Sequence, residues 1–598
     1  MTVQPSIHIK RGITMKKIIL ASLSAKFIHS SLALRYLTRF ADNDKRHQLQ
    51  TMEFTINQRL DFIADELFRQ QPDVILFSCY IWNVEMIKQL CPLLKKILPN
   101  CLLGAGGPEV SYESEVFLQE NPDMDLIMRG EGELVFTQLL EHLDHNQPPS
   151  LADICGLTIR QNGAILSTPA QQPLDLALLP FPYEEDFSDV HNQIIYYETQ
   201  RGCPYSCGYC LSSIEKGVRF VPLEKVLPQL QKFLDARVRQ VKFIDRTFNC
   251  KKSHAMAIWQ YLHTHDNGVT NFHFEITADL LDQETIDFLK TVRKGLFQFE
   301  IGVQSTNPQT IGAINRNVDF EKLSAVVKQI KAGDNIHQHL DLIAGLPYED
   351  YDSFGRSFND VYALRPEQLQ LGFLKVLKGS MIHQRRQDFA IVYQDTAPYE
   401  VLTTHALPYT DTLRLKYVEE MVETYYNSGK FLHVLDYLVP LYDSPFAFFE
   451  QLSQYWIGHN CHYQYQSKIG LCDILWQFVQ QNAQVDAVQF QWLLKFDLAL
   501  HEKPKKLPQW LTVSNEKQWH HAIVDFYRTP DYVAQYLPHY VGTDSKVTAR
   551  QTHLEVFGEA EAFTAILFDY DHKDLLQNAA YTMIPLTLLQ QTADWQEP

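Results

Sequence analysis

Short apolar runs alternate with segments of helical periodicity over residues 15–146. The apolar runs predict five strands, at Lys17–Leu23, Thr51–Ile56, Asp73–Cys79, Cys101–Gly104 and Leu126–Arg129. The segments between them predict helices at Ser31–Phe40, at Asn57–Gln70 with Asn57 as the N-cap, and at Asn83–Leu98. Strands that alternate with helices indicate an open parallel sheet covered on both faces. Ligands of such sheets bind beyond the C-terminal ends of the strands.

A second alternation of the same kind covers residues 194–378. It predicts six strands, at Ile194–Thr199, Gln240–Asp245, Phe272–Thr277, Phe297–Val303, His339–Ala344 and Gln368–Leu374. Helical segments between them include Leu223–Leu234, Gln283–Val292 and Phe320–Lys331. Six strand–helix units in a row predict a partial parallel (β/α)6 barrel.

The remaining segments complete the expected domain organisation. Residues 1–14 form an N-terminal extension, and the six prolines of residues 147–193 indicate an irregular interdomain linker. Residues 379–598 form a mainly helical C-terminal domain, with a helix at Asp411–Tyr426 and a return to strands after Lys546. Six aromatic residues of this domain suit an ordinary core or a helical cap over the barrel mouth: Tyr417, Tyr425, Tyr426, Phe446, Phe448 and Phe449.

Composition excludes several classes of protein. A chain of 598 residues with 45% apolar content is too long for a single core. The formal charge of −18 argues against nucleic acid or an anionic membrane as a partner. The apolar run after Met15 is too short for a secretory signal or a membrane span, so we expect a cytoplasmic protein. In that reducing compartment the ten cysteines do not form a disulfide framework.

Three cysteines lie within eight residues directly after a predicted strand: Cys203, Cys207 and Cys210. A tight loop of this kind can wrap an iron–sulfur cluster and leave one iron without a protein ligand. A zinc knuckle that lacks its fourth ligand, or a chance grouping, would give the same pattern. The Cys-x3-Cys-x2-Cys spacing after the first strand of a partial barrel resembles the radical S-adenosylmethionine (SAM) enzymes. This resemblance implies a [4Fe–4S] cluster, SAM on the open iron, an external flavodoxin- or ferredoxin-like electron donor and a 5′-deoxyadenosyl radical.

The same resemblance implies a set of SAM contacts along the barrel. Glu300-Ile-Gly-Val-Gln-Ser305 is similar to a Gly-Val-Gln-Ser segment of the coproporphyrinogen-oxidase-like branch, and Arg316 stands where that branch pairs an arginine with the SAM carboxylate. The second strand ends in Asp245-Arg-Thr-Phe248 instead of the usual Gly-Gly-Glu, so Asp245 is the substitute contact for the SAM amino group. The implied set is Tyr209, Asp245, Glu275, Gln304, Arg316, Asp341 and Gly345.

A flavodoxin-like (Rossmann-like) domain before such a barrel resembles the cobalamin-binding subclass of these enzymes. Ser78-Cys-Tyr80 and Gly106-Gly107 end successive strands 28 residues apart, and they are similar to that subclass's Ser-x-Leu and Gly-Gly segments. The resemblance implies cobalamin contacts at Ser78, Tyr80, Gly106 and Gly107. The Asp-x-His-x-x-Gly signature is absent, so His29 is expected to be structural and the cobalt to lack a protein histidine. A domain that binds nothing is the alternative.

Gly130-Glu-Gly-Glu133 is also similar to the subclass, where it shapes the domain interface.

Taken together, these resemblances predict a radical SAM enzyme, specifically a cobalamin-dependent methyltransferase acting on a small-molecule or peptide substrate. Three alternatives stay open. They are a cobalamin-assisted oxidation or rearrangement, a methylthiotransferase or other RNA-modifying enzyme with a vestigial cobalamin domain, and a corrinoid- or cluster-binding sensor. The RNA-modifying reading normally requires further clustered cysteines and a basic surface.

Overall fold

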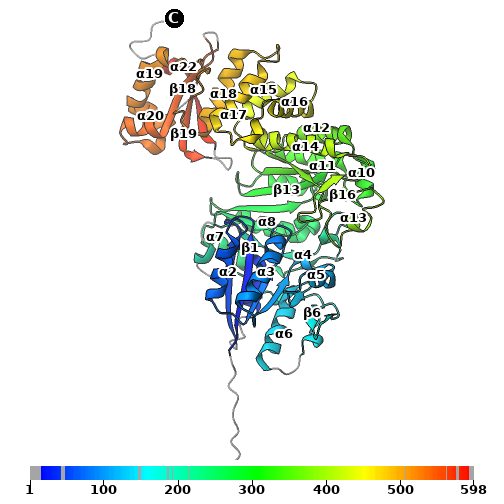
Figure 1. The fold of residues 1–598 in the computed structure, drawn as a ribbon. Coiled ribbons are helices and arrows are strands. Elements are labelled where there is room, and N and C mark those ends of the chain that lie inside the picture. The colour runs from blue at the N-terminus through cyan, green and yellow to red at the C-terminus, as the bar shows by residue number, and fades with distance from the viewer. Residues whose placement is uncertain are drawn as a thin grey trace, which may run out of the picture.

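The structure is a computed structural model, and it describes residues 15–41, 47–145, 150–184, 187–190, 193–214, 216–505, 507–559, 562–573 and 578–590. The expected N-terminal extension, residues 1–14, lies outside the described residues. Figure 1 shows the blue N-terminal sheet and the orange-red C-terminal unit at opposite ends of the molecule, with the green barrel and the yellow helices between them. Among the described residues, no helix has the length and apolar character needed to cross a membrane.

The N-terminal sheet contains the five expected parallel strands: β1 (Lys17–Ser24), β2 (Gln48–Thr55), β3 (Val74–Ser78), β4 (Leu102–Gly106) and β5 (Leu126–Met128). Their order is β2-β1-β3-β4-β5, so the strand order reverses at β1 and β3. Side chains alternate along β1, and Ile18 and Leu20 pack beneath α1 (Leu32–Phe40) and α6 (Gly132–His145). Ile19 and Ala21 pack beneath α2 (Leu60–Arg69), α3 (Val84–Ile97) and α5 (Ser114–Glu120). The expected open sheet with helices on both faces is confirmed.

Two local expectations for this region are wrong. The segment 147–193, expected to be irregular, contains β6 (Leu157–Gln161) and β7 (Ala164–Ser167), an antiparallel hairpin that extends the sheet from β5. Asn162 and Gly163 both have positive φ and form the two-residue turn that matches the twist of such strands. Asn57 is not the N-cap of α2, because the helix begins at Leu60 and Gln58 N donates to Thr55 O in the turn after β2.

The six expected barrel strands are confirmed. They are β8 (Ile195–Tyr197), β11 (Gln240–Phe243), β12 (Asn271–Ile276), β13 (Phe297–Gln304), β14 (His337–Ala344) and β15 (Gln368–Phe373), paired in parallel in this order. The helices that connect them are α7 (Leu223–Asp235), α8 (Lys252–Thr264), α9 (Gln283–Leu289), α10 (Pro308–Ala313), α11 (Phe320–Lys331) and α12 (Tyr351–Tyr362). Phe297 and Phe299 of β13 are buried against these helices, so Gln298 and Glu300 project to the barrel interior.

The helices that follow the barrel pack against it and share its hydrophobic core. The helices are α14 (Tyr409–Met421), α15 (Leu432–Leu438), α16 (Pro445–Gly458), α17 (Lys468–Val479) and α18 (Ala487–His501). α16 packs on α12 through Phe446 and Phe449, whose rings lie 5.4 Å from Tyr351 and 5.8 Å from Phe358. Five of the six aromatic residues named above are therefore core residues, and Tyr417 is half-buried.

A small α/β unit follows and packs against α18 through Phe557 and Phe568. The strands expected after Lys546 are present as β18 (Thr552–Phe557), β19 (Thr564–Lys573) and β20 (Ala579–Ile584), which form an antiparallel sheet. They pack against α19 (Glu516–Arg528) and α20 (Pro530–Tyr536) around their own apolar core, which includes Trp519 and Phe526.

Candidate active site between the two sheets

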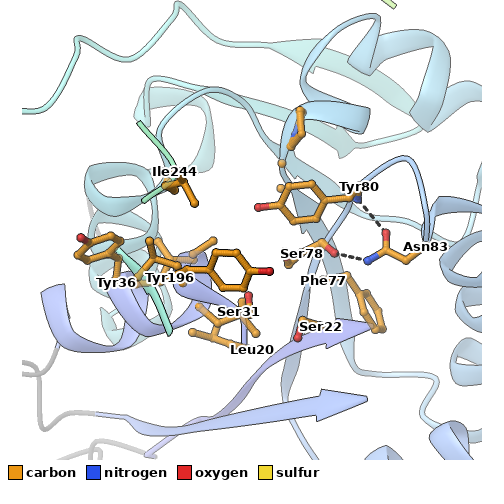
Figure 2. Close-up of a pocket in the computed structure, with 18 of the residues that line it drawn as sticks. Leu20, Ser22, Ser31, Tyr36, Phe77, Ser78, Tyr80, Asn83, Tyr196 and Ile244 are labelled. Carbon is orange, nitrogen blue, oxygen red and sulfur yellow. Dashed lines mark hydrogen bonds between the residues drawn. The ribbon is translucent and has the colours of Figure 1, made fainter. Parts of the chain in front are cut away.

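The C-terminal ends of the first sheet and of the barrel's first strands enclose one cavity of about 660 Å³. The first sheet contributes the ends of β1, β3 and β4, which include the point where the strand order reverses. The barrel contributes Tyr196 and Glu198 at the end of β8, and Ile244 and Arg246 after β11. Figure 2 shows Tyr196 and Tyr80 pointing into this space from opposite sides. Its position is where α/β sheets bind their ligands.

The four predicted cobalamin contacts, Ser78, Tyr80, Gly106 and Gly107, all line this cavity. Gly107 has φ +116°, and a Cβ on it would lie 2.5 Å from the Cys79 carbonyl oxygen, so the close approach of β3 and β4 requires glycine. A Cβ on Gly106 would meet only ordinary van der Waals contacts, the nearest at 3.4 Å to Met128, so the backbone there does not require glycine.

The buried side-chain amide of Asn83 joins the ends of β1 and β3 at the cavity. Asn83 donates through Nδ2 to the carbonyl oxygens of Leu23 (3.0 Å) and Ser78 (2.9 Å), and its Oδ1 accepts from Tyr80 N at 2.8 Å. Figure 2 shows the bonds from Asn83 to Tyr80 and Ser78. Trp82 stacks on Tyr80 with 4.4 Å between ring centroids, which gives the cavity an aromatic wall.

His29 also lines the cavity, and its Nδ1 lies 2.6 Å from the Tyr196 hydroxyl. Burial and the nearby ammonium of Lys26 lower the pKa of His29. The imidazole therefore joins the first sheet to the barrel, in agreement with its expected structural role.

The three clustered cysteines lie in the loop that follows the short strand β9 (Gln200–Arg201). Gly208 fixes the middle of the loop, since its N–H donates to Ile314 O at 2.7 Å and its carbonyl accepts from Ile382 N at 2.9 Å. A Cβ on Gly208 would lie 2.1 Å from the terminal methyl of Met381, so the Met381 side chain packs directly against this glycine. All ten cysteines of the chain are free thiols.

Arg316 connects this loop to the barrel. Its Nη1 lies 3.6 Å from Cys207 Sγ and donates to the Tyr209 hydroxyl at 3.1 Å, while Nη2 donates to the Gly302 carbonyl. Burial raises the pKa of the Cys207 thiol, and the Arg316 charge opposes that shift. Within the described residues, Arg316 Nε and Gln304 Oε1 are buried without a hydrogen-bond partner. These orphaned groups suit a polar ligand beside the cysteine loop.

Glu275 on β12 and Asp341 on β14 project into the barrel from the two strands that flank β13. Glu275 Oε2 lies 3.9 Å from Arg246 Nη1, and Asp341 Oδ1 lies 3.0 Å from His339 Nε2. Burial raises the pKa of both carboxyl groups. Carboxylates in this environment are stabilised by a cationic or hydroxyl-bearing ligand.

Two of the predicted SAM contacts have other partners in the structure. Asp245 is fully buried and accepts hydrogen bonds from Thr199 N (2.8 Å), Thr199 Oγ1 (2.6 Å) and Gln200 N (3.0 Å). Both of its oxygens thereby fasten the chain that leads to Cys203, and burial raises its pKa to about 7. Gly345 has φ +83°, but the space in front of it is filled by Val401, 2.6 Å from a Cβ there. This geometry favours positioning roles for Asp245 and Gly345.

A buried ion network joins the two sheets behind the cavity. Arg201 Nη2 donates to Glu198 Oε1 at 2.8 Å and to Glu133 Oε1 at 2.5 Å, and Nη1 lies 3.6 Å from Glu131 Oε1. Glu131 also pairs with Arg219. Glu131 and Glu133 belong to the Gly130–Glu133 segment expected at the domain interface, and the structure places them there.

Three family models match successive parts of the chain. One described as "B12 binding domain" matches residues 18–140, one described as "Radical SAM superfamily" matches residues 197–361, and one described as "Protein of unknown function (DUF4080)" matches residues 387–566.

The chain joins a B12-binding domain to a radical SAM domain.

Two similar curated proteins are methyltransferases by name, and one of these names contains the same combination. The cobalamin-dependent radical SAM methyltransferase TokK of Streptomyces tokunonensis is 29% identical over 312 residues, 48% of this chain and 44% of that protein. The 2-(S-pantetheinyl)-carbapenam-3-carboxylate methyltransferase of Streptantibioticus cattleyicolor is 28% identical over 320 residues, 47% of this chain and 44% of that protein. The chain thus spans less than half the length of these two relatives.

Among solved structures, the cobalamin-dependent SAM radical enzyme OxsB, with aqua-cobalamin and SAM bound, aligns with a TM-score of 0.58. The alignment covers 81% of this chain and 79% of OxsB at 15% identity, which supports the fold.

The residues present fit the groups that these two domains imply. A radical SAM domain implies a [4Fe–4S] cluster and SAM, and three free thiols on one loop are the donor set that leaves one iron open. Gln304 Oε1 and Arg316 Nε are the orphaned polar atoms that SAM would satisfy. In the B12-binding domain, Gly106 and Gly107 form the cradle, and Ser22 Oγ lines the cavity without a partner among the described residues.

Sequence reasoning missed several residues that shape this site: Tyr196, Glu198, Arg201, Arg246, Trp82 and Asn83. Asn83 was expected at the start of a helix, and its position just past β3 was the available signal for a strand-end contact. Arg201 had a weaker signal, its place two residues before Cys203. Tyr196, Glu198 and Arg246 lie near the ends of barrel strands that sequence alone does not pair with the first sheet, and Trp82 lies in the loop between β3 and α3.

Proposed function

We propose that this protein is a cobalamin-dependent radical SAM methyltransferase that acts on a small-molecule or peptide substrate. The observation that carries the proposal is the shared cavity. The predicted cobalamin contacts line one side of it, and Arg201, two residues before the first cluster cysteine, lines the other. The two methyltransferase relatives support the reaction class.

The chain's own residues would bind and orient the reactants. Arg316 would hold the SAM carboxylate through its planar guanidinium, while Gln304 and Glu275 would contact the rest of SAM inside the barrel. Gly106, Gly107 and Ser78 would admit the nucleotide tail of the corrinoid, and Tyr80 and Trp82 would shield the cavity from water. Once bound, the cluster and SAM would supply a 5′-deoxyadenosyl radical, formed from SAM by one electron. The corrinoid would supply a cobalt centre that carries the methyl group.

An external electron donor belongs to this proposal. The cluster needs one electron for each SAM that it cleaves, and we expect a flavodoxin- or ferredoxin-like protein to deliver it. The acidic charge of −18 makes nucleic acid a poor candidate substrate.

The test uses the full chain, reconstituted without oxygen with iron, sulfide and hydroxocobalamin. SAM carrying a trideuterated methyl group and a reductant are added together with the small-molecule fraction of a cell extract. We expect 5′-deoxyadenosine and a product that carries the deuterated methyl group, and neither from the variant with Cys203, Cys207 and Cys210 changed to Ala. Formation of 5′-deoxyadenosine with an unlabelled new product would overturn methyl transfer in favour of oxidation or rearrangement. Absence of 5′-deoxyadenosine would overturn the radical mechanism as well.

A further inference from the structure

A second group of metal-ligating side chains lies inside the barrel, apart from the cysteine loop. His273 on β12, Glu300 on β13, and His339 and Asp341 on β14 share the inward face of three adjacent strands. Glu300 pairs in register with His339, and Glu275, two residues after His273, pairs with Glu300. Because inward positions repeat every second residue, this register brings the four side chains to one place.

The distances among Glu300, His339 and Asp341 are those of ligands that share one ion. His339 Nε2 lies 3.0 Å from Asp341 Oδ1, while His273 Nε2 lies 3.0 Å from Glu300 Oε2 at the edge of the site. One ligand atom each from Glu300, His339 and Asp341 lies within 4.8 Å of the others. Two ligands held at right angles by a first-row metal, each about 2.1 Å from it, are about 3 Å apart.

His339 Nε2 and Asp341 Oδ1 have no hydrogen bond to another group in the described part of the chain. His339 is 6% exposed, and its Nε2 atom is buried without a hydrogen-bond partner among the described residues. The same holds for Asp341 Oδ1, so its 3.0 Å contact with His339 does not have hydrogen-bond geometry. Buried polar atoms in this state are destabilising unless a ligand satisfies them.

We propose that Glu300, His339 and Asp341 bind one divalent first-row transition-metal ion inside the barrel. One imidazole and two carboxylates are nitrogen and oxygen donors that Zn²⁺, Fe²⁺ and Mn²⁺ accept, and the two carboxylates balance the charge of the ion. The set contains no thiolate, which separates it chemically from the cysteine loop.

Lys242 sets a limit on the affinity of this site. Its Nζ lies 3.0 Å from Glu300 Oε2, and an ammonium at the edge of the site repels a second cation. Both contacts of Glu300 with its neighbours use Oε2, and within the described chain no hydrogen bond or ion pair engages Oε1. Oε1 is therefore the oxygen available to the ion.

The test uses Co²⁺ as the probe in full-length protein free of corrinoid, with the three loop cysteines changed to Ala so that no thiolate competes. We expect one equivalent of Co²⁺ with visible ligand-field bands and without thiolate charge-transfer bands. The variants His339→Asn and Glu300→Gln should each bind Co²⁺ at least tenfold more weakly. Asp341 is left unchanged because it is also a predicted SAM contact.

The matched control is His337→Asn. His337 lies on the same face of β14, two residues before His339, and its Nε2 is likewise buried without a partner in the described structure. Its affinity for Co²⁺ should equal that of the parent. The assignment is overturned if the parent binds no Co²⁺, if His339→Asn and Glu300→Gln bind it as the parent does, or if His337→Asn loses it equally. Amide hydrogen exchange in β13 and β14 checks that each variant is folded.

Discussion

Replacing Arg201 with Met tests whether the buried ion network holds the B12-binding domain to the radical SAM domain. Arg201 is 16% exposed in its side chain, and Glu133 and Glu198 are each 6% exposed. The substitution keeps the unbranched apolar stem of the side chain but leaves both carboxylates without their shared counter-ion. Breaking a buried ion pair from one side is destabilising by about 3–5 kcal/mol. We expect a loss of that size in the free energy of opening the interface.

Glu133→Gln should have a smaller effect on the same quantity. The network contains three carboxylates, Glu131, Glu133 and Glu198, and two guanidinium groups, Arg201 and Arg219. Removing one carboxylate charge leaves the remaining charges balanced, and the Gln oxygen still accepts from Arg201. The measurement is amide hydrogen exchange of residues 130–136 and 197–203, which reports local opening without requiring two-state unfolding of the whole chain. Arg59→Met, which removes an exposed ion pair with Asp61, is the control and should change nothing.

The defect in Arg201→Met should also depend on pH. Burial raises the pKa of Glu198, and Arg201 opposes that shift, so the variant's Glu198 should have a still higher pKa. A carboxyl group whose folded-state pKa is raised gives its full stability below the unfolded pKa, and that stability is lost as pH rises through the folded value. The opening free energy of the variant should therefore fall further at mildly alkaline than at mildly acidic pH. A deficit below about 1 kcal/mol, typical of surface pairs, or one larger at acidic pH, would refute the reasoning.

Four further predictions concern the cofactor sites. Changing the three loop cysteines together to Ala should abolish cluster iron and the broad visible absorption of a thiolate-ligated cluster; a four-iron cluster in that variant would contradict the assignment. Arg316→Ala should weaken SAM binding, measured by calorimetry with the cluster loaded, by about 1.5–3 kcal/mol, the value for a hydrogen bond to a charged group; unchanged affinity would remove Arg316 from the site. Gly106→Leu should prevent hydroxocobalamin uptake at normal iron content, whereas Gly312→Leu, whose Cβ meets open space, should not. Electron paramagnetic resonance of the Co(II) form should show no nitrogen splitting that His29→Ala removes, because the Asp-x-His-x-x-Gly signature of a cobalt-ligating histidine is absent.

Gly106 is a better probe of the corrinoid site than its neighbour Gly107. A side chain on Gly107 would meet the Cys79 carbonyl at 2.5 Å and would require a strained φ of +116°. A loss of corrinoid in that variant would then follow from a distorted backbone. Gly106 carries neither constraint, so a side chain there acts mainly by filling the cavity.

The repeating units of the fold were predictable because each carries a strong local signal. All six barrel strands were predicted within two residues at their starts, and the helix Phe320–Lys331 has the same bounds in sequence and structure. Buried parallel strands are continuous apolar runs, which sets them apart from the amphipathic helices between them.

The hairpin β6–β7 was missed although its signal was present. Asn162-Gly163 between two short apolar runs is a strong local indication of a two-residue hairpin turn. The six prolines of residues 147–193 led instead to the prediction of an irregular linker, but none of them falls between Leu157 and Ser167. The prolines therefore mark the ends of this element and not its interior.

The candidate site was predictable only where its residues lie on one loop or one strand end. The three cysteines needed no tertiary information, because their spacing alone brings them together. Arg201 and Glu133 are 68 residues apart, and His29 and Tyr196 are 167 apart. In a sequence, a single charged or imidazole residue whose partner is not evident is most simply assigned to the protein surface. Only the packing of one sheet on the other identifies these pairs.

The C-terminal region is part of the same chemical unit as the barrel. Its first helix, α13 (Met381–Gln384), bonds to Gly208 in the middle of the cysteine loop, and Val401 of β17 (Val401–Thr403) fills the space at Gly345. The Tyr399 hydroxyl donates to Glu109 of the B12-binding domain, which Lys378 also approaches at 3.5 Å. One short stretch of chain thus contacts the cluster loop, the barrel and the corrinoid domain at once. Because these contacts lie between the two cofactor sites, residues 378–403 should be as important for the reaction as the barrel itself. Removing the region matched by the DUF4080 model, residues 387–566, would take away Tyr399 and Val401 and so loosen the contacts with the B12-binding domain and with Gly345.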